Sequence, residues 1–185
     1  MNVCRVAYLE HINSIRNLLS IVAVKTQVSS LVLSRLDYCH SLLVGLPQYL
    51  IKRLQGVQNA AAISILRTPR SEHISLLLQN LHWLPVNRRT LHKVAALCHC
   101  SLSGSGPQYL SDLTHVYTPA RSLRTSPNTR ILSTPNVKLK SYGQRSFAYH
   151  HPNTWNFLPL AILQNYQQES DCFKRALKTH LFSLN

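Results

Sequence analysis

The sequence predicts a mainly α-helical protein. A small helical bundle is followed by a basic, partly irregular arm that could contain a short β-hairpin, and then by an amphipathic C-terminal helix. Two observations predict this fold class. Apolar residues recur every three or four positions through the first two-thirds of the 185 residues, which is the spacing of one helical face. The stretch that follows is rich in Ser, Thr, Pro and Asn, which favour turns and extended backbone over helix.

The first two apolar stripes precede Gly45. They consist of Leu9, Ile12, Ile15, Leu19 and Val22, and of Val28, Val32, Leu36, Cys39 and Leu43. Gly45 suits the end of the second helix, because glycine readily adopts the left-handed conformation that often follows a helix. Pro47 suits the first turn of the next helix, where its missing N–H costs nothing.

Three further helices are predicted between Pro47 and Gly104. The first and third carry apolar faces formed by Leu50, Leu54, Val57, Ala61 and Ile65, and by Leu91, Val94, Ala95, Cys98 and Leu102. The shorter helix between them covers residues 74–81 and ends before Leu84-Pro85, because the residue before a proline avoids the helical region. Together the stripes predict a helical bundle over residues 1–112.

The composition changes after residue 112. No acidic residue occurs from Leu113 to Gln168, and residues 113–145 are predicted to form the basic arm, with room for short strands at 130–133 and 137–139. Residues 146–185 combine an aromatic segment with a closing helix. We expect Ser170 or Asp171 to cap that helix, and its inward face to consist of Phe173, Ala176, Leu177, Leu181 and Leu184.

The charge of the chain is strongly one-sided. Twenty Lys and Arg face six Asp and Glu, which gives a formal net charge of +14. Such a surface attracts polyanions, so RNA or DNA is the expected partner, with an acidic protein or a ribosome-like packing role as alternatives. The residues expected to contact phosphates are Lys52, Arg53, Arg88, Arg89, Lys93, Arg121, Arg124, Arg130, Lys138, Lys140 and Arg145.

Four aromatic residues stand within or beside the end of the basic arm: Tyr142, Phe147, Tyr149 and Trp155. Their rings could stack on unpaired bases. They could equally anchor the arm onto the bundle, since large rings are usually buried. The sequence leaves both interpretations open.

Catalysis is not predicted. A nucleotide polymerase gathers two or three carboxylates around paired metal ions, whereas the acids here are scattered as Glu10, Asp37, Glu72, Asp112, Glu169 and Asp171. Cys98 and Cys100 would point about 200° apart on a helix, so they would not share one zinc ion. We therefore expect no enzyme activity, no catalytic residue, no metal and no cofactor.

The expected compartment is intracellular, either nucleus or cytoplasm. The five cysteines are odd in number and irregular in spacing, which is not typical of a secreted disulfide framework. The first residues lack the uninterrupted apolar core of a signal peptide, and no apolar run reaches the length of a membrane span. A membrane partner is therefore not expected.

Five blocks of the sequence occur in an order that resembles one known family. They are LSRLDYCHSLLVGLPQYLIKRLQGVQNAAA (33–62), LHWLPVNRRTLHKV (81–94), PQYLSDLTHVYTPARSLRTS (107–126), SYGQRSFAYHHPNTWNFLPLAI (141–162) and FKRALKTHLF (173–182). The series is similar to the region that follows the polymerase in jockey-like LINE (non-LTR) retrotransposon reverse transcriptases, and it covers nearly the whole chain. His40 and Gly56 depart from the pattern, where the family is expected to have Asn and a basic residue.

The resemblance implies a non-catalytic fragment of an RNA-directed DNA polymerase, namely its thumb and post-polymerase region. Its implied task is to hold template and primer, and none of the family's catalytic residues maps onto this chain. The missing polymerase core is then a further expected partner. The alternative is a structural or interaction module, or a non-functional relic, that needs that core to fold.

Overall fold

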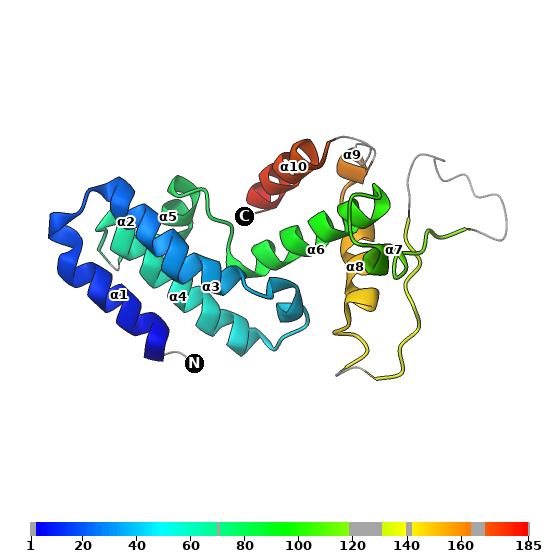
Figure 1. The fold of residues 1–185 in the computed structure, drawn as a ribbon, viewed down its shortest axis with the longest axis horizontal. Helices are drawn as coiled ribbons and strands as arrows, with labels where there is room; N and C mark the ends of the chain where they lie inside the picture. Colours follow the sequence, from blue (N-terminus) through cyan, green and yellow to red (C-terminus); the bar gives the residue numbers. More distant parts are fainter. Residues whose placement is uncertain (1–2, 70, 119–130, 140–141, 164–168, 185) are drawn as a thin grey trace. The chain divides into compact units, whose positions relative to one another are not determined.

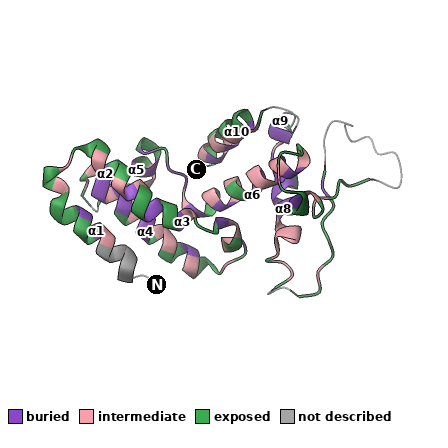
Figure 2. Ribbon diagram, in the orientation of Figure 1, coloured by how far each residue is buried: buried purple, intermediate pink, exposed green. Residues whose placement is uncertain are grey.

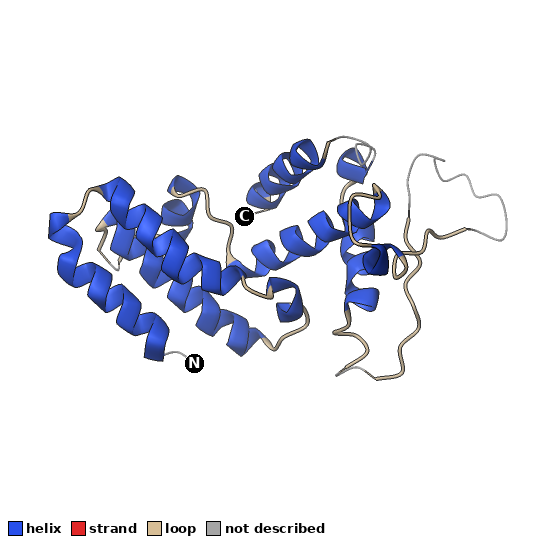
Figure 3. Ribbon diagram, in the orientation of Figure 1, coloured by secondary structure: helices blue, strands red, loops and turns tan. Residues whose placement is uncertain are grey.

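The computed structural model describes residues 3–69, 71–118, 131–139, 142–163 and 169–184 (Figure 1). The prediction of a mainly α-helical protein with a C-terminal helix is confirmed (Figure 3). Within these ranges the β-structure consists of one isolated antiparallel bridge, between Val116 and Leu132. The chain forms two compact units: unit 1 is residues 1–40 with 46–87, and unit 2 is residues 41–45 with 88–185. The boundary predicted at residue 112 lies inside unit 2.

Unit 1 is a helical bundle. Its α-helices are α1 (Val3–Ile15), α2 (Ile21–Val28), α3 (Ser34–Asp37), α4 (Gln48–Leu66) and α5 (Ile74–Asn80). The core lies where α1, α2 and α5 pack against α4, and Figure 2 shows the buried residues concentrated there. Val28, Ala61 and Ile65 are among its most deeply buried members, as the helical stripes predict.

The first predicted stripe is interrupted. A 3₁₀ turn at Arg16–Leu18 follows α1, and α2 begins only after Ser20, whose Oγ accepts a hydrogen bond from the Ala23 amide at 3.3 Å. Leu9 and Ile12 are buried as expected, but Val22 is 69% exposed. The expectation of one continuous face was wrong because Ser20 caps a new helix and so resets the helical phase.

The second predicted stripe is correct as far as Leu36. Val28, Val32 and Leu36 are buried along a path that includes a π-helical turn at Ser29–Leu33. Cys39 is exposed, with a φ of 52°, so its placement on the apolar face was wrong. The helix ends at Asp37, and a short 3₁₀ helix at His40–Leu43 precedes Gly45, which has the left-handed φ of 72° that suits glycine.

Helix α5 ends one residue before the predicted range 74–81, and α4 contains the whole predicted face from Leu50 to Ile65. Pro47 stands immediately before α4, at the cap position rather than in the first turn. Leu50 and Leu54 are half-buried, and Val57, Ala61 and Ile65 are buried, which confirms the predicted face.

Unit 2 contains most of α6 (Val86–Leu102), then α7 (Gln108–Ser111), α8 (Phe147–Asn156), α9 (Leu160–Leu163) and α10 (Ser170–Ser183). Its core is aromatic. The His99 ring stacks on Phe173 with centroids 4.2 Å apart, and Trp155 lies 5.8 Å from the same Phe173 ring. Thus α6, α8 and α10 meet through their side chains, which an apolar stripe on each helix predicts.

Two details of α10 differ from the prediction. Ser170 is the first helical residue and Glu169 holds the cap position, with no side-chain cap hydrogen bond, so the predicted cap was wrong. Phe173, Leu177 and Leu181 are buried, whereas Ala176 and Leu184 are exposed. The buried face is therefore narrower than predicted.

The predicted short strands do not form a hairpin in the described residues. Leu132 makes the isolated bridge, and residues 137–139 are irregular. The reason lies in Asn156: its amide donates to the Leu132 carbonyl oxygen and its Oδ1 accepts from the Leu132 N–H, both at 2.9 Å. The Asn156 side chain thereby occupies the backbone N–H and C=O of Leu132, which a neighbouring strand would otherwise have paired. Arg130 lies outside the described residues.

Candidate nucleic-acid interface

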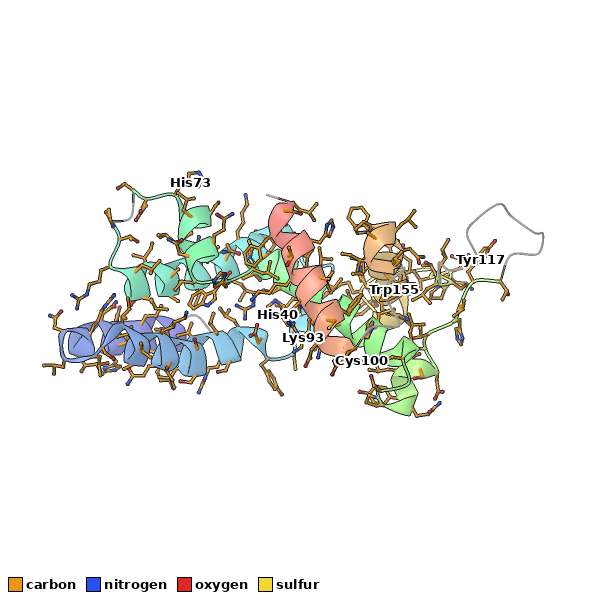
Figure 4. All side chains as sticks on the ribbon, turned by 90° about the horizontal axis from the view of Figure 1, so that it is seen from above. His40, His73, Lys93, Cys100, Tyr117 and Trp155 are labelled. Atoms are coloured by element: carbon orange, nitrogen blue, oxygen red, sulfur yellow. The ribbon has the colours of Figure 1, made fainter. Side chains whose placement is uncertain are left out.

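The predicted phosphate contacts divide between the two units. Lys52 and Arg53 are exposed on α4 in unit 1. Lys93, labelled in Figure 4, is exposed on α6 in unit 2. Lys138 and Arg145 are also exposed and belong to unit 2. Four residues of the predicted set lie outside the described residues, namely Arg121, Arg124, Arg130 and Lys140.

Arg88 has an internal role that the sequence did not reveal. Its guanidinium donates one hydrogen bond to the carbonyl oxygen of Leu181 and another to that of Leu184, each at 2.8 Å. These carbonyls belong to the C-terminal turn of α10, where backbone acceptors lack helical partners and a cation is favourable. Arg88 therefore holds the end of α10, and Arg89 beside it is half-buried.

In unit 1 the structure reveals a groove between α1 and α4, which pack side by side (Figure 1). Its volume is about 720 Å³. The polar side chains that line it come from Glu10, Asn13, Arg16, Arg53, Asn59, Ser64, Arg67 and Thr68. We call this the arginine groove, because three guanidinium groups share it.

Helix periodicity explains why Arg53 and Arg67 share the arginine groove. They stand fourteen residues apart, which is close to four turns, so both belong to one face of α4 or its immediate C-terminal extension. Arg67 is the residue after α4, in the left-handed conformation with φ 56°. Arg16 joins them from the turn after α1, where one of its N–H groups donates to the Ile65 carbonyl oxygen.

The set of phosphate contacts predicted from the sequence includes Arg53 but neither Arg16 nor Arg67. The fourteen-residue spacing was a usable signal for Arg67. No sequence pattern indicated Arg16, because its place in the arginine groove depends on how α1 packs against α4.

The electrostatics of the arginine groove are unusual for arginine. Burial lowers the pKa of Arg16, and the positive charge of Arg67 lowers it further. Both causes disfavour the charged form, and an anion beside the two guanidiniums would favour it. Arg67 in turn donates to Asn17 Oδ1 at 2.9 Å, which holds it near this end of the arginine groove.

The four aromatic residues have different environments. Trp155 is fully buried at 0% exposure, so it anchors the core of unit 2 and is closed to bases. Phe147 stacks on His151 at 4.6 Å, and Tyr149 meets His150 edge-on at 5.7 Å. Tyr142 is 81% exposed and is the ring of this set that remains open to a partner.

Cys98 and His151 are buried in unit 2. Cys98 is buried, and that burial raises the pKa of its thiol well above the usual value, which disfavours the thiolate that a metal requires. His151 donates a hydrogen bond from Nδ1 to the Phe147 carbonyl oxygen at 2.8 Å, and its Nε2 is hydrogen-bonded with Thr114 Oγ1 at 3.2 Å. In the described ranges no three His, Cys, Asp or Glu side chains gather as a metal site would need.

No helix in the described part of the chain combines the length and apolarity that crossing a membrane would require. Comparison with known proteins gives no significant match to any family model, curated protein or solved structure.

Proposed function

We propose that this chain binds RNA or DNA through the phosphate backbone, as a non-catalytic, thumb-like part of a LINE-type reverse transcriptase, the family that its sequence blocks resemble. The observation that carries the proposal is the charge balance. Even if every carboxylate neutralised one cation, the net charge of +14 would remain. A polyanion is the partner that such a surface selects, and neutralising it releases the counterions condensed on nucleic acid.

The exposed cations support this proposal. Two ion pairs join Asp37 to His40 at 3.4 Å and Asp171 to Lys174 at 3.3 Å. Neither pair uses one of the five exposed residues of the predicted set, which are Lys52, Arg53, Lys93, Lys138 and Arg145. Their charges face solvent, where a phosphate can meet them.

The test is the salt dependence of binding, measured by fluorescence anisotropy with labelled single-stranded and duplex oligonucleotides. We expect the logarithm of the association constant to fall linearly with the logarithm of salt, by about 0.7 to 0.9 per phosphate neutralised. Six contacts would cost about a thousandfold in affinity between about 50 and 200 mM salt. Absence of binding at low salt, or an affinity that does not change with salt concentration, would contradict the proposal.

The non-catalytic part of the proposal has its own test. Purified protein is incubated with a primed template, divalent metal and labelled nucleotides. We expect binding of the primed template without extension of the primer. Incorporation of label above a no-enzyme control would show that the chain polymerises.

A second candidate function is an interaction module, supported by apolar surface on unit 1. Leu18 is 88% exposed, and Ile21 and Val22, which follow three and four residues later, are also exposed. Exposed apolar residues that adjoin one another are typical of an interface. Sedimentation velocity would test this function: we expect self-association that Val22→Ser weakens, and a clean monomer at high concentration would reject it.

A further inference from the structure

We propose that the arginine groove is a phosphate-binding site that holds the backbone of one nucleic-acid strand, with Arg53 toward one end and Arg16 and Arg67 at the other. The inference rests on the proposed function and deepens it, because it names a surface that the charge balance alone does not locate. Two of the three arginines lie outside the set predicted from sequence.

The first argument is the supply of unused donors. A guanidinium carries five N–H donors. Arg16 gives one to the Ile65 carbonyl oxygen and Arg67 gives one to Asn17. Within the described ranges no carboxylate lies within 4.0 Å of either guanidinium, or of Arg53. Planar, preorganised forks without an acidic partner are suited to phosphate oxygens.

The second argument is that two like charges are held together. The Arg16 guanidinium is tied to the end of α4 and the Arg67 guanidinium to Asn17, so neither can swing freely away from the other. Burial lowers the pKa of Arg16, and the repulsion from Arg67 lowers it further. An anion between the two groups offsets both, as donors fixed in advance bind charge with little reorganisation.

The third argument concerns the neutral lining. Asn59 accepts a hydrogen bond at Oδ1 from Gln55 at 2.7 Å, which leaves its amide hydrogens as donors toward a ligand. Thr68 is a further polar group at the Arg67 end. One carboxylate, Glu10, also lines the arginine groove and opposes anion binding there. Its removal is therefore informative.

The length of the arginine groove favours a strand over a free ion. Fourteen residues at a rise of about 1.5 Å place Arg53 and Arg67 about 21 Å apart along the helix axis. A nucleic-acid strand carries a phosphate at every nucleotide, so one strand can place phosphates at both ends of that distance. A single inorganic phosphate would engage one end alone.

A purely structural role does not account for the whole arginine groove. Arg16 does satisfy a carbonyl at the C-terminal end of α4, where a cation is favourable. That role would leave Arg53 unexplained, since Arg53 lies in the first half of α4, away from the helix end. The groove between α1 and α4 is what the three residues share.

The loss-of-function test removes the two arginines that do not hold α4. Arg53→Gln/Arg67→Gln should weaken oligonucleotide binding by about tenfold or more per contact, as lost hydrogen bonds to a charged group do, and should lower the salt slope by about one unit per contact. The matched control is Lys25→Gln/Arg175→Gln, which removes two exposed cations outside the arginine groove. Equal losses in both double variants would overturn the proposal.

A second test leaves every arginine in place and does not threaten folding. Gly56 lines the arginine groove, and a Cβ built there meets no atom within 4 Å. Gly56→Glu should therefore weaken binding by placing a carboxylate in the groove, whereas Gly56→Gln should leave it unchanged. Glu10→Gln should strengthen binding. If Gly56→Glu and Gly56→Gln bind alike, the groove does not hold phosphates.

A third measurement separates this proposal from the proposed function. Inorganic phosphate is titrated into the protein while the side-chain Nε–Hε resonances of Arg16 and Arg67 are followed by NMR. If wild-type protein binds oligonucleotides and the groove variants match their controls, the groove assignment fails and the proposed function stands. If no oligonucleotide binds, the proposed function fails and the assignment of a strand to the groove fails with it. Shifts at Arg16 and Arg67 would then show a site for free phosphate alone, and their absence would reject a phosphate site altogether.

Discussion

The side-chain amide of Gln58 donates a hydrogen bond to the Leu84 carbonyl oxygen at 2.9 Å, and Gln58 is fully buried. Three residues earlier on α4, Gln55 accepts a hydrogen bond at Oε1 from the Val86 amide at 2.8 Å. Two glutamines on one face of α4 thus hydrogen-bond the backbone of the segment that leads into α6.

Gln58→Met should lower the free energy of unfolding by about 1–3 kcal/mol, because it leaves a buried carbonyl oxygen without its donor while keeping the volume similar. Urea denaturation measures the change. Gln79→Met is the matched control, since Gln79 is exposed on α5, and surface substitutions usually stay within about 0.5 kcal/mol. Equal effects at both positions would show that the Gln58 bond does not stabilise unit 1.

Arg88→Lys should destabilise the protein by about 1 kcal/mol while leaving nucleic-acid affinity nearly unchanged. Lysine keeps the charge but cannot reproduce the two-pronged contact with the Leu181 and Leu184 carbonyls. Thermal unfolding and anisotropy would be measured together, with the exposed Arg175→Lys as the control. Unchanged stability combined with weaker binding would instead assign Arg88 to a phosphate, as the charge pattern predicts.

Two glycine substitutions should have opposite effects on stability. Gly56→Ala should stabilise the protein by about 1 kcal/mol, since alanine is the better helix former and a Cβ there meets open space. Gly45→Ala should destabilise it, because φ is +72° and the new Cβ would come within 2.9 Å of Arg145 Cγ. Chemical denaturation of both variants tests the pair, and a shift in the same direction would contradict the backbone argument.

Unit 2 should lose stability in mild acid. Burial lowers the pKa of His92 and of His151 below the ordinary value of 6.5, and nearby basic side chains add to the effect, chiefly Lys178 at His92 and His115 at His151. A hydrogen bond from each ring to a backbone carbonyl, Lys174 O for His92 and Phe147 O for His151, opposes the shift without cancelling it.

The sign of this pH dependence follows from proton binding. Well above pH 6.5 both rings are neutral in either state, and their contribution to stability is present in full. Below it the unfolded chain binds protons first, so stability falls as the pH drops through the lowered pKa values. Unfolding free energies across this range would measure the slope. His151→Asn should flatten it, and His73→Gln, at an exposed position, should not.

Much of the fold is encoded locally. The stripes of α4 and α6 and the buried line Phe173, Leu177 and Leu181 on α10 could be read from spacing, because a helix brings every third or fourth residue to one face whatever it packs against. The net charge likewise follows from the amino-acid composition alone. These features predict a mainly helical, strongly basic protein.

Tertiary structure decided how polar groups are used. Arg88 seemed a free cation until its partners on α10 were known, and Asn156 replaced a strand for Leu132 through a side chain that no periodicity marks. The arginine groove likewise exists because α1 brings Arg16 beside the end of α4. Helical periodicity acts over one turn, whereas these contacts join residues 24 to 96 positions apart, and only packing brings such distant side chains together.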